Sequence, residues 1–174
     1  GDYSGQNIND YLSAIDDVRK EPWVNNDKLG CVGASYGGYS VFYLAGHHQK
    51  RFKTFIAHCG MYNFESFYGA TEETFFPNND LGGAFWDKSN KIAQKSYENS
   101  PHKFIQNWDT PIMIITGERD YRIPYTESLQ AFNAAQLRGI PSKLLVFPDE
   151  THFVTKPQNA VVWQREFFGW LDKW

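Results

Sequence analysis

The chain has 174 residues, 41% of them hydrophobic and 21% charged, which is the composition of a single packed globular domain. Its net charge of −3 and the lack of any block of like charge argue against nucleic acids and anionic membranes as partners. No apolar run approaches the ~20 residues needed to cross a bilayer, and no C-x-x-C or H-E-x-x-H motif indicates a metal site. Cys31 and Cys59, both in predicted strands, are expected to be buried free thiols.

The first third of the chain predicts two strands, with a helix before each of them. Residues 7–21 repeat apolar side chains at helical spacing. The apolar face of this helix consists of Ile8, Tyr11, Leu12, Ile15 and Val18. A strand is expected over 28–32, a helix over 36–45 and a second strand over 53–58.

The remainder of the chain predicts an irregular segment followed by two strands and two helices. Residues 61–108 are aromatic and Asn-rich with interspersed Pro and Gly, which favours short helices and loops. The continuous apolar run 112–116 is typical of a parallel strand buried on both faces. A helix over 124–138, a strand over 143–147 and a helix over 157–174 follow it. The apolar face of the last helix consists of Trp163, Phe167, Leu171 and Trp174. The alternation predicts an α/β fold with about four parallel strands between two helical layers.

The run Gly33-Ala34-Ser35-Tyr36-Gly37-Gly38 directly follows the first predicted strand and fits G-x-S-x-G, the nucleophile elbow of serine hydrolases. Ser35 would lie on a tight turn between strand and helix, with its hydroxyl pushed into solvent. Because Gly33 and Gly37 crowd the backbone at this turn, we expect that both must lack a side chain. The first turn of the following helix would direct free N–H groups at a developing oxyanion.

An isolated serine hydroxyl needs a base that is held by an acid, and in α/β folds such groups collect at the carboxyl ends of strands. Asp120 follows the third predicted strand and His152 follows the fourth. The alternative for Asp120 is an ordinary turn aspartate. The order Ser35, Asp120, His152 is that of α/β-hydrolases. The other histidines are expected to be structural or solvated, and these are His47, His48, His58 and His102.

Each of these three residues lies in a longer motif. The motifs are Gly33-Ala34-Ser35-Tyr36-Gly37-Gly38-Tyr39, Gly117-Glu118-Arg119-Asp120-Tyr121-Arg122-Ile123-Pro124 and Glu150-Thr151-His152. On these motifs the chain resembles the prolyl oligopeptidase family of serine peptidases, and most of all its acylaminoacyl-peptidase and dipeptidyl-peptidase V branch. The resemblance covers nearly the whole chain and implies an α/β-hydrolase fold, a three-layer α/β/α sandwich.

The resemblance also implies roles for residues. Ser35 would attack the scissile carbonyl, His152 would act as base and then as acid, and Asp120 would orient His152. The backbone N–H of Tyr36 would be one oxyanion donor. The positions that line the primary specificity pocket in the family are here Met61, Phe64, Phe67, Arg122 and Ile123. The size and apolar character of Met61, Phe64 and Phe67, with Tyr36 and Ile123 nearby, imply a small or apolar residue before the cleaved bond. The same aromatics would equally serve to pack the 61–108 segment onto the sheet.

Family catalytic domains carry further strands, a second oxyanion donor and a β-propeller upstream of the position of Gly1. The resemblance therefore implies that residues 1–174 are the C-terminal part of a partial domain, without its N-terminal part and without the propeller. The strand before Ser35 would then be an exposed apolar edge that invites self-association or a homodimer. Because the natural N-terminus is expected upstream, a cytoplasmic location and a periplasmic or exported one both stay open.

The leading hypothesis is a serine peptidase that hydrolyses short peptides through an acyl-enzyme, of the dipeptidyl- or acylaminoacyl-peptidase type, without a cofactor or metal. One alternative is an esterase on the same fold, since a fold does not fix the substrate. The other is a catalytically inactive module that only binds or assembles, because the loss of one oxyanion donor costs about 10²–10³ in rate.

Overall fold

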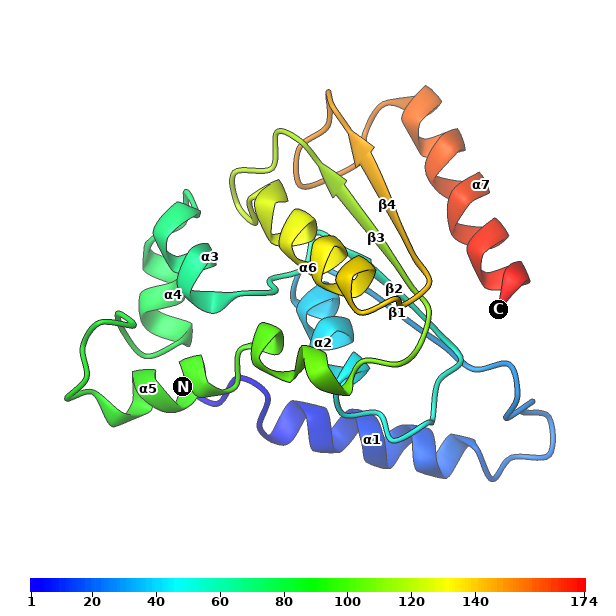
Figure 1. Ribbon diagram of the computed structural model, residues 1–174, viewed down its shortest axis with the longest axis horizontal. Helices are drawn as coiled ribbons and strands as arrows, with labels where there is room; N and C mark the ends of the chain where they lie inside the picture. The colour runs from blue at the N-terminus through cyan, green and yellow to red at the C-terminus, as the bar shows by residue number, and fades with distance from the viewer.

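The computed structural model describes all 174 residues, and helices alternate with strands along it (Figure 1). In chain order the elements are α1 (Gln6–Val18), β1 (Gly30–Ala34), α2 (Tyr36–Ala45), β2 (Thr54–His58), α3 (Phe64–Ala70), α4 (Phe75–Asp80), α5 (Lys91–Glu98), the 3₁₀ helix η1 (Pro101–Asn107), β3 (Ile112–Gly117), α6 (Tyr125–Leu137), β4 (Ser142–Phe147) and α7 (Pro157–Lys173). All four predicted strands are present, with ends that differ by one or two residues, and the 61–108 segment holds short helices as expected. None of the helices combines the length and the apolarity that a membrane crossing requires.

The four strands form one parallel sheet in the order β1-β2-β3-β4. Parallel neighbours need a long crossover, and a helix supplies it between each pair. Helices α2 and α6 cover one face of the sheet and α7 covers the other (Figure 1). The three-layer α/β arrangement is therefore confirmed, and β3 is buried along its whole length, as its continuous apolar run predicted.

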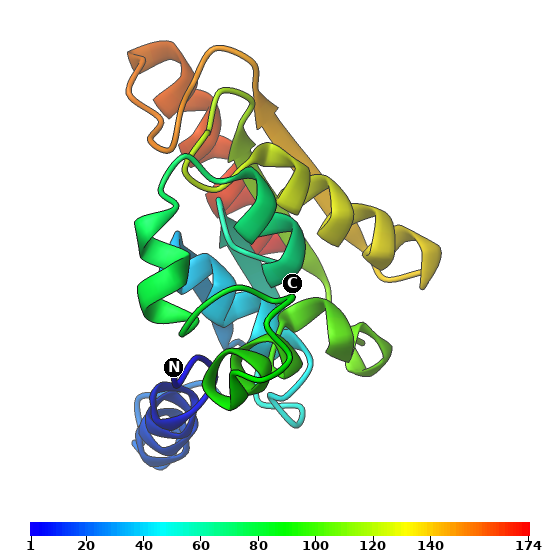
Figure 2. The same cartoon turned by 90° about the vertical axis from the view of Figure 1, so that its left-hand side faces the viewer.

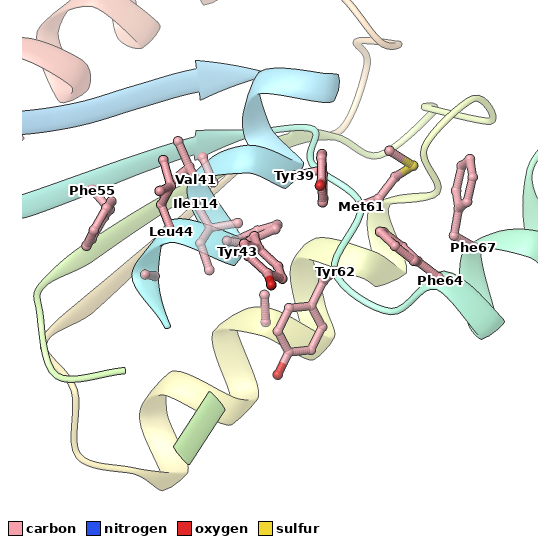
Figure 3. Close-up of a cluster of buried hydrophobic side chains, with 14 of the residues drawn as sticks. Tyr39, Val41, Tyr43, Leu44, Phe55, Met61, Tyr62, Phe64, Phe67 and Ile114 are labelled. Carbon is pink, nitrogen blue, oxygen red and sulfur yellow. The ribbon is translucent and has the colours of Figure 1, made fainter. Parts of the chain in front are cut away.

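The larger core lies on the face that carries α2 and α6, and aromatic side chains dominate it (Figure 3). Phe42 of α2 stacks on Trp108, with ring centroids 5.8 Å apart. Tyr62 packs edge-on against both rings. Because each buried aromatic removes about 150–250 Å² from water, this cluster anchors the 61–108 segment to the sheet.

The smaller core joins α7 to the opposite face of the sheet. Trp170 is its most buried helical residue, and its indole N–H donates to Thr54 Oγ1 at 2.7 Å. Trp174 follows the end of α7 at Lys173 and is 38% exposed, but it lines a cavity with Phe167 and Leu171, which agrees with its predicted place on this face.

Strand β1 lies at the edge of the sheet and pairs with β2 alone. Its residues alternate between exposed and half-buried, and the side chain of Val32 is 48% exposed. Helix α1 packs loosely beside it, leaving a cavity of about 440 Å³ that Val32 also lines. Figure 2 shows α1 end-on, at the opposite end of the molecule from the start of α7. Ser35, which follows β1 directly, is therefore carried by an edge strand, as expected.

Candidate active site

Ser35 occupies a strained turn between β1 and α2. Its backbone has φ 59° and ψ −119°, a conformation that costs a non-glycine residue about 1–3 kcal/mol. Two hydrogen bonds hold the turn, from Ser35 N–H to the carbonyl of His58 at 2.9 Å and from Tyr39 N–H to the carbonyl of Ser35 at 3.0 Å. A positive φ at serine is the geometry that a nucleophile elbow requires.

The glycines around the turn are not equally constrained. A Cβ on Gly33 would lie 2.3 Å from the carbonyl oxygen of Gly37, so Gly33 must lack a side chain, as predicted. The expectation for Gly37 is wrong, because a Cβ there would meet nothing within 4 Å. The second constraint falls on Gly38, where a Cβ would lie 2.5 Å from the carbonyl oxygen of His58. Helix α2 thus approaches the end of β2 closely at Gly38.

The side chains of Ser35, His152 and Asp120 form a continuous chain of hydrogen bonds. His152 Nε2 lies 2.9 Å from Ser35 Oγ, and His152 Nδ1 lies 2.7 Å from Asp120 Oδ2. An ionised carboxylate only accepts, so Nδ1 carries the ring proton and Nε2 is free to accept the serine proton. Asp120 is 2% exposed and His152 is 9% exposed. The three elements that bring them together are β1, β3 and β4, whose carboxyl ends meet at one edge.

The turn after β3 holds Asp120 in place. Its Oδ1 accepts the backbone N–H groups of Arg122 at 3.0 Å and Ile123 at 2.9 Å, which leaves Oδ2 for His152. This side-chain-to-backbone pattern is typical of aspartates that shape their own turn. The carboxylate therefore has fixed partners on both oxygens.

The loop that carries His152 is anchored through Glu150, whose side chain is almost fully buried. The backbone carbonyl of Glu150 accepts the N–H of Arg119 at 3.0 Å, which ties this loop to the Asp120 turn. Burial raises the pKa of the Glu150 carboxyl, but hydrogen bonds outweigh it and hold that pKa below its usual range. The donors, at 2.8 to 3.2 Å, lie in or just before the first turn of α7, and they are Asn159, Thr155 and Lys156.

A cavity of about 260 Å³ opens on one side of Ser35. Four of the five predicted pocket residues line it, and so does Tyr36. The complete lining is Ser35, Tyr36, Met61, Phe67, Glu73, Phe76, Asp80, Arg122 and Ile123. Charged groups stand among the apolar ones, and Arg122 Nε lies 3.0 Å from Glu73 Oε1. The cavity thus combines apolar walls with a charged rim.

Phe64 is the one predicted pocket residue that does not line this cavity. It is fully buried and packs against the rings of Tyr3 and Tyr39, at centroid distances of 5.5 and 5.6 Å. For Phe64 the structure favours the alternative of packing, because α3 turns this side chain inward toward α2. In Figure 3 Phe64 lies beside Met61 and Phe67 at the end of the core nearest α3.

The backbone N–H of Tyr36 donates no hydrogen bond within the chain, because Tyr36 is the first residue of α2. Helix N-termini leave such donors free, and they favour negative charge nearby. Tyr36 N–H is therefore available next to Ser35 as a donor to an oxyanion.

A second cavity, of about 330 Å³, lies on the α7 side of Ser35 and is lined in part by His58. The sequence predicts a structural or solvated His58, and its packing against Trp163 fits the structural alternative. Its Nδ1 accepts the indole N–H of Trp163 at 3.3 Å, and its Nε2 is buried without a partner. Burial, with a smaller contribution from the charge of His152, lowers the pKa of His58 to about 4. His58 is therefore neutral at pH 7.

The side chains of Cys59, Asp120 and His152 bring possible metal-ligand atoms within 4.8 Å of one another. Two of these residues already bond to each other. Burial raises the pKa of the Cys59 thiol to about 12, and only the thiolate is a good metal ligand. The donor set suits an Asp120 that orients His152 for proton transfer with Ser35 better than it suits a metal. Cys59 is buried, Cys31 is half-buried, and both are free thiols.

The whole chain, residues 1–174, matches the model of the prolyl oligopeptidase family. Dipeptidyl-peptidase 5 of Porphyromonas gingivalis is 59% identical over 174 residues, which is 100% of this chain and 25% of that protein. Dipeptidyl-peptidase 5 of Schizosaccharomyces pombe is 34% identical over 172 residues, 98% of this chain and 25% of that protein. The chain thus spans about a quarter of the length of these relatives.

Solved structures share the fold. Pyrococcus horikoshii acylaminoacyl peptidase superposes with a TM-score of 0.86 at 21% identity, over 97% of this chain and 28% of that chain. An acylaminoacyl peptidase in complex with Z-Gly-Gly-Phe-chloromethyl ketone superposes with a TM-score of 0.84 at 22% identity, over 95% of this chain and 27% of that chain. The fold of the chain is that of the α/β-hydrolases. With its full length matched by the family model and a relative 59% identical to it, the chain belongs to the prolyl oligopeptidase family.

Proposed function

We propose that this chain carries the catalytic centre of a serine peptidase that hydrolyses short peptides, of the dipeptidyl- or acylaminoacyl-peptidase type. The observation that carries the proposal is the hydrogen-bonded chain from Ser35 Oγ through His152 to Asp120, at 2.9 and 2.7 Å, with Ser35 at a positive φ. Relatives named dipeptidyl-peptidase 5 support the reaction type.

The first half of the reaction is acylation. As Ser35 Oγ bonds to the substrate carbonyl carbon, its proton passes to His152 Nε2, and the charge on His152 is stabilised by Asp120. The carbonyl oxygen becomes an oxyanion, which accepts a hydrogen bond from the backbone N–H of Tyr36. The carbon–nitrogen bond then breaks, and His152 returns the proton to the leaving amine.

The second half is deacylation. Water takes the place of the departed amine, and His152 Nε2 removes a proton from it as its oxygen bonds to the acyl carbon. The bond to Ser35 Oγ breaks and the serine recovers its proton from His152. These steps call on no cofactor, because each proton moves between Ser35, His152, the leaving amine and water.

The 260 Å³ cavity beside Ser35 is the proposed site for the residue before the cleaved bond. Met61, Phe67 and Ile123 give it apolar walls, which favours a small or apolar side chain. An acylaminoacyl peptidase of the same fold forms a complex with Z-Gly-Gly-Phe-chloromethyl ketone, whose peptide ends in an apolar residue.

We further propose that residues 1–174 are the C-terminal part of a larger catalytic domain, whose upstream part completes the sheet along β1 and supplies a second oxyanion donor, and which follows a β-propeller. The exposed edge of β1 and the 25% coverage of the relatives support this arrangement. If nothing upstream of Gly1 covered β1, the same edge would be available for self-association.

The test is the reaction of the natural polypeptide that carries these residues with a fluorophosphonate probe and with dipeptidyl and acylaminoacyl amides. We expect labelling at Ser35 and amide hydrolysis, and Ser35→Ala should abolish both, with a loss of about 10⁶ in kcat. A folded protein that is not labelled would refute the proposal. Amide turnover near background with rapid cleavage of simple esters would favour the esterase instead.

Two observations favour an inactive role for the isolated 174 residues: Ser35 follows an edge strand, and Tyr36 supplies one oxyanion donor where two are usual. We expect the isolated chain to be weakly active or inactive. Hydrolysis by the isolated chain that Ser35→Ala abolishes would contradict this expectation.

A further inference from the structure

Glu127, in the first turn of α6, is a fully buried carboxylate outside the catalytic chain of hydrogen bonds. Its Oε2 accepts two backbone N–H groups, from Tyr62 at 2.9 Å and from Asn63 at 2.7 Å. Its Oε1 accepts the hydroxyl of Ser66 and the side-chain amide of Gln130, the latter at 3.4 Å. Of the other donors, Tyr62 and Asn63 lie between β2 and α3, and Ser66 lies in the first turn of α3.

Gln130, one turn further along α6, completes the same network. Its carbonyl oxygen accepts the side-chain amide of Asn63 at 3.1 Å, and its own amide donates to Ser66 Oγ at 2.9 Å. A buried carboxylate is costly unless all its acceptor sites are used, and here they are. Burial raises the pKa of the Glu127 carboxyl, while the hydrogen bonds from Ser66, Asn63 and Tyr62 oppose that rise.

The groups that Glu127 binds flank two residues of the cavity beside Ser35. Met61 directly precedes Tyr62, and Phe67 directly follows Ser66. Both side chains line the cavity, and they lie beside each other in Figure 3. Fixing the backbone before and after these positions fixes where the two side chains stand.

A second part of the cavity wall is attached to the same helix. Arg122 and Ile123 belong to the turn that leads into α6, and their N–H groups bind Asp120. Helix α6 is therefore joined to one wall by the chain itself and to the other by Glu127. The two walls also bond to each other directly, since Thr71 Oγ1 at the end of α3 donates to the carbonyl of Arg122 at 2.7 Å, so Glu127 is one of several ties between them.

We propose that Glu127 is a positioning residue that sets the shape of this cavity and thereby the selectivity for the residue before the cleaved bond. This role rests on the proposed peptidase function. Glu127 touches neither the reacting atoms nor the cavity surface, so it acts through Met61 and Phe67. The reaction steps at Ser35 do not depend on it.

The test compares Glu127→Ala and Glu127→Gln with the wild-type natural polypeptide, on dipeptidyl amides with Ala or Phe before the cleaved bond. In Glu127→Ala we expect the ratio of kcat/KM values for the two substrates to move at least about tenfold toward one, mainly through KM. Glu127→Gln keeps one oxygen for the N–H groups of Tyr62 and Asn63, so it should restore most of the selectivity.

Two controls separate positioning from general destabilisation. Ile140→Ala opens a cavity in the core beyond the far end of α6 and should leave the selectivity ratio unchanged at a comparable loss of stability. A small fluorophosphonate, which does not fill the cavity, should label Ser35 equally fast in all variants. If Glu127→Ala does not fold, Ser66→Ala removes one partner of Glu127 and should shift selectivity in the same direction by a smaller factor.

The two proposals fail in different ways. Absent labelling and turnover in folded wild-type protein would overturn the peptidase function and this role with it. Normal wild-type turnover with unchanged selectivity in Glu127→Ala, or in Ser66→Ala where that variant is the one that folds, would overturn the positioning role alone. A selectivity shift in Ile140→Ala as large as in Glu127→Ala would overturn it as well.

Discussion

The two oxygens of the Asp120 carboxylate have different partners, so a substitution of Asp120 can affect both the base and the cavity wall. Oδ2 accepts from His152, while Oδ1 accepts from the backbone of Arg122 and Ile123 beside the cavity. One carboxylate thus orients the base and fixes a wall of the proposed specificity site. A change at Asp120 that preserves its shape tests the first role without disturbing the second.

Asp120→Asn should lower kcat by about 10⁴ while the protein stays folded, because an amide on His152 Nδ1 favours the wrong tautomer of the ring. The measurement is amide hydrolysis by the natural polypeptide together with its unfolding curve. Asp149→Asn is the matched control, since Asp149 lies in the His152 loop and pairs with Lys156 instead. An equal loss in the control would contradict the assigned role of Asp120.

The contrast between Gly37 and Gly38 gives a second test at this scale. Gly38→Ala places a Cβ against the backbone carbonyl of His58 and should destabilise the protein by about 1–3 kcal/mol. Gly37→Ala meets open space and replaces a helical glycine, so it should be neutral or stabilising by up to about 1 kcal/mol. Urea unfolding measures the free energy of unfolding of both variants. An equal loss of stability in the two would show that the close approach of α2 to β2 at Gly38 is not rigid.

At the scale of elements, the loop that carries His152 is tied to its neighbours by Glu150 rather than by apolar packing. The Glu150 side chain binds the start of α7, and its carbonyl binds the Asp120 turn. The geometry of the base therefore depends on the ionisation of a carboxylate two residues away from it.

Hydrogen bonds hold the pKa of Glu150 below its usual range against the opposing effect of burial. A lowered pKa contributes stability that is present above the unfolded-state value of about 4.3 and is lost as pH falls through the folded-state value. We expect Glu150→Gln to be less stable than wild type at pH 7, and the difference between them to shrink below about pH 4.3. Thermal unfolding of both proteins between pH 7 and the acidic range measures this difference in stability. A difference that does not depend on pH would refute the expectation.

Sequence periodicity predicted the elements well and the contacts between them poorly. Apolar runs located all four strands, and turn residues after β3 and β4 pointed to Asp120 and His152. Glu127 and Gln130 carried no such signal, because charged and polar residues spaced by three on a helix usually mark a solvated face. Their partners lie 61 to 67 residues away in the chain, a pairing that only the folded arrangement defines.

The predicted pocket residues show the same limit. Met61 and Phe67 line the cavity while Phe64, between them in sequence, turns into the core. Which side of a short helix faces the cavity depends on the direction in which α3 leaves β2, and Glu127 determines that direction. The motif around Ser35 was likewise correct in type but misplaced the second obligatory glycine, because that requirement arises from the approach of α2 to β2.

At the scale of the whole molecule, β1 leaves one edge of a parallel sheet unpaired, with Val32 48% exposed. Unpaired N–H and C=O groups on an apolar edge recruit other strands. We therefore expect the strand that positions Ser35 to promote association of the isolated 174 residues.

The isolated chain should elute above its monomer mass, and Val32→Lys should return it toward the monomer because an edge lysine blocks strand pairing. Size-exclusion chromatography with light scattering measures this. Leu137→Lys is the control, since Leu137 is 90% exposed at the end of α6, away from the edge. Equal effects of the two substitutions would assign the association to general hydrophobicity.

His152 follows Ser35 by 117 residues, and its loop is held by groups at the start of α7. A ribosome therefore releases the nucleophile long before the base that activates it. Until the segment that becomes α7 has left the exit tunnel, the loop has no anchor and Ser35 remains an ordinary alcohol. The proposed catalytic centre can therefore form only when the synthesis of these 174 residues is almost complete.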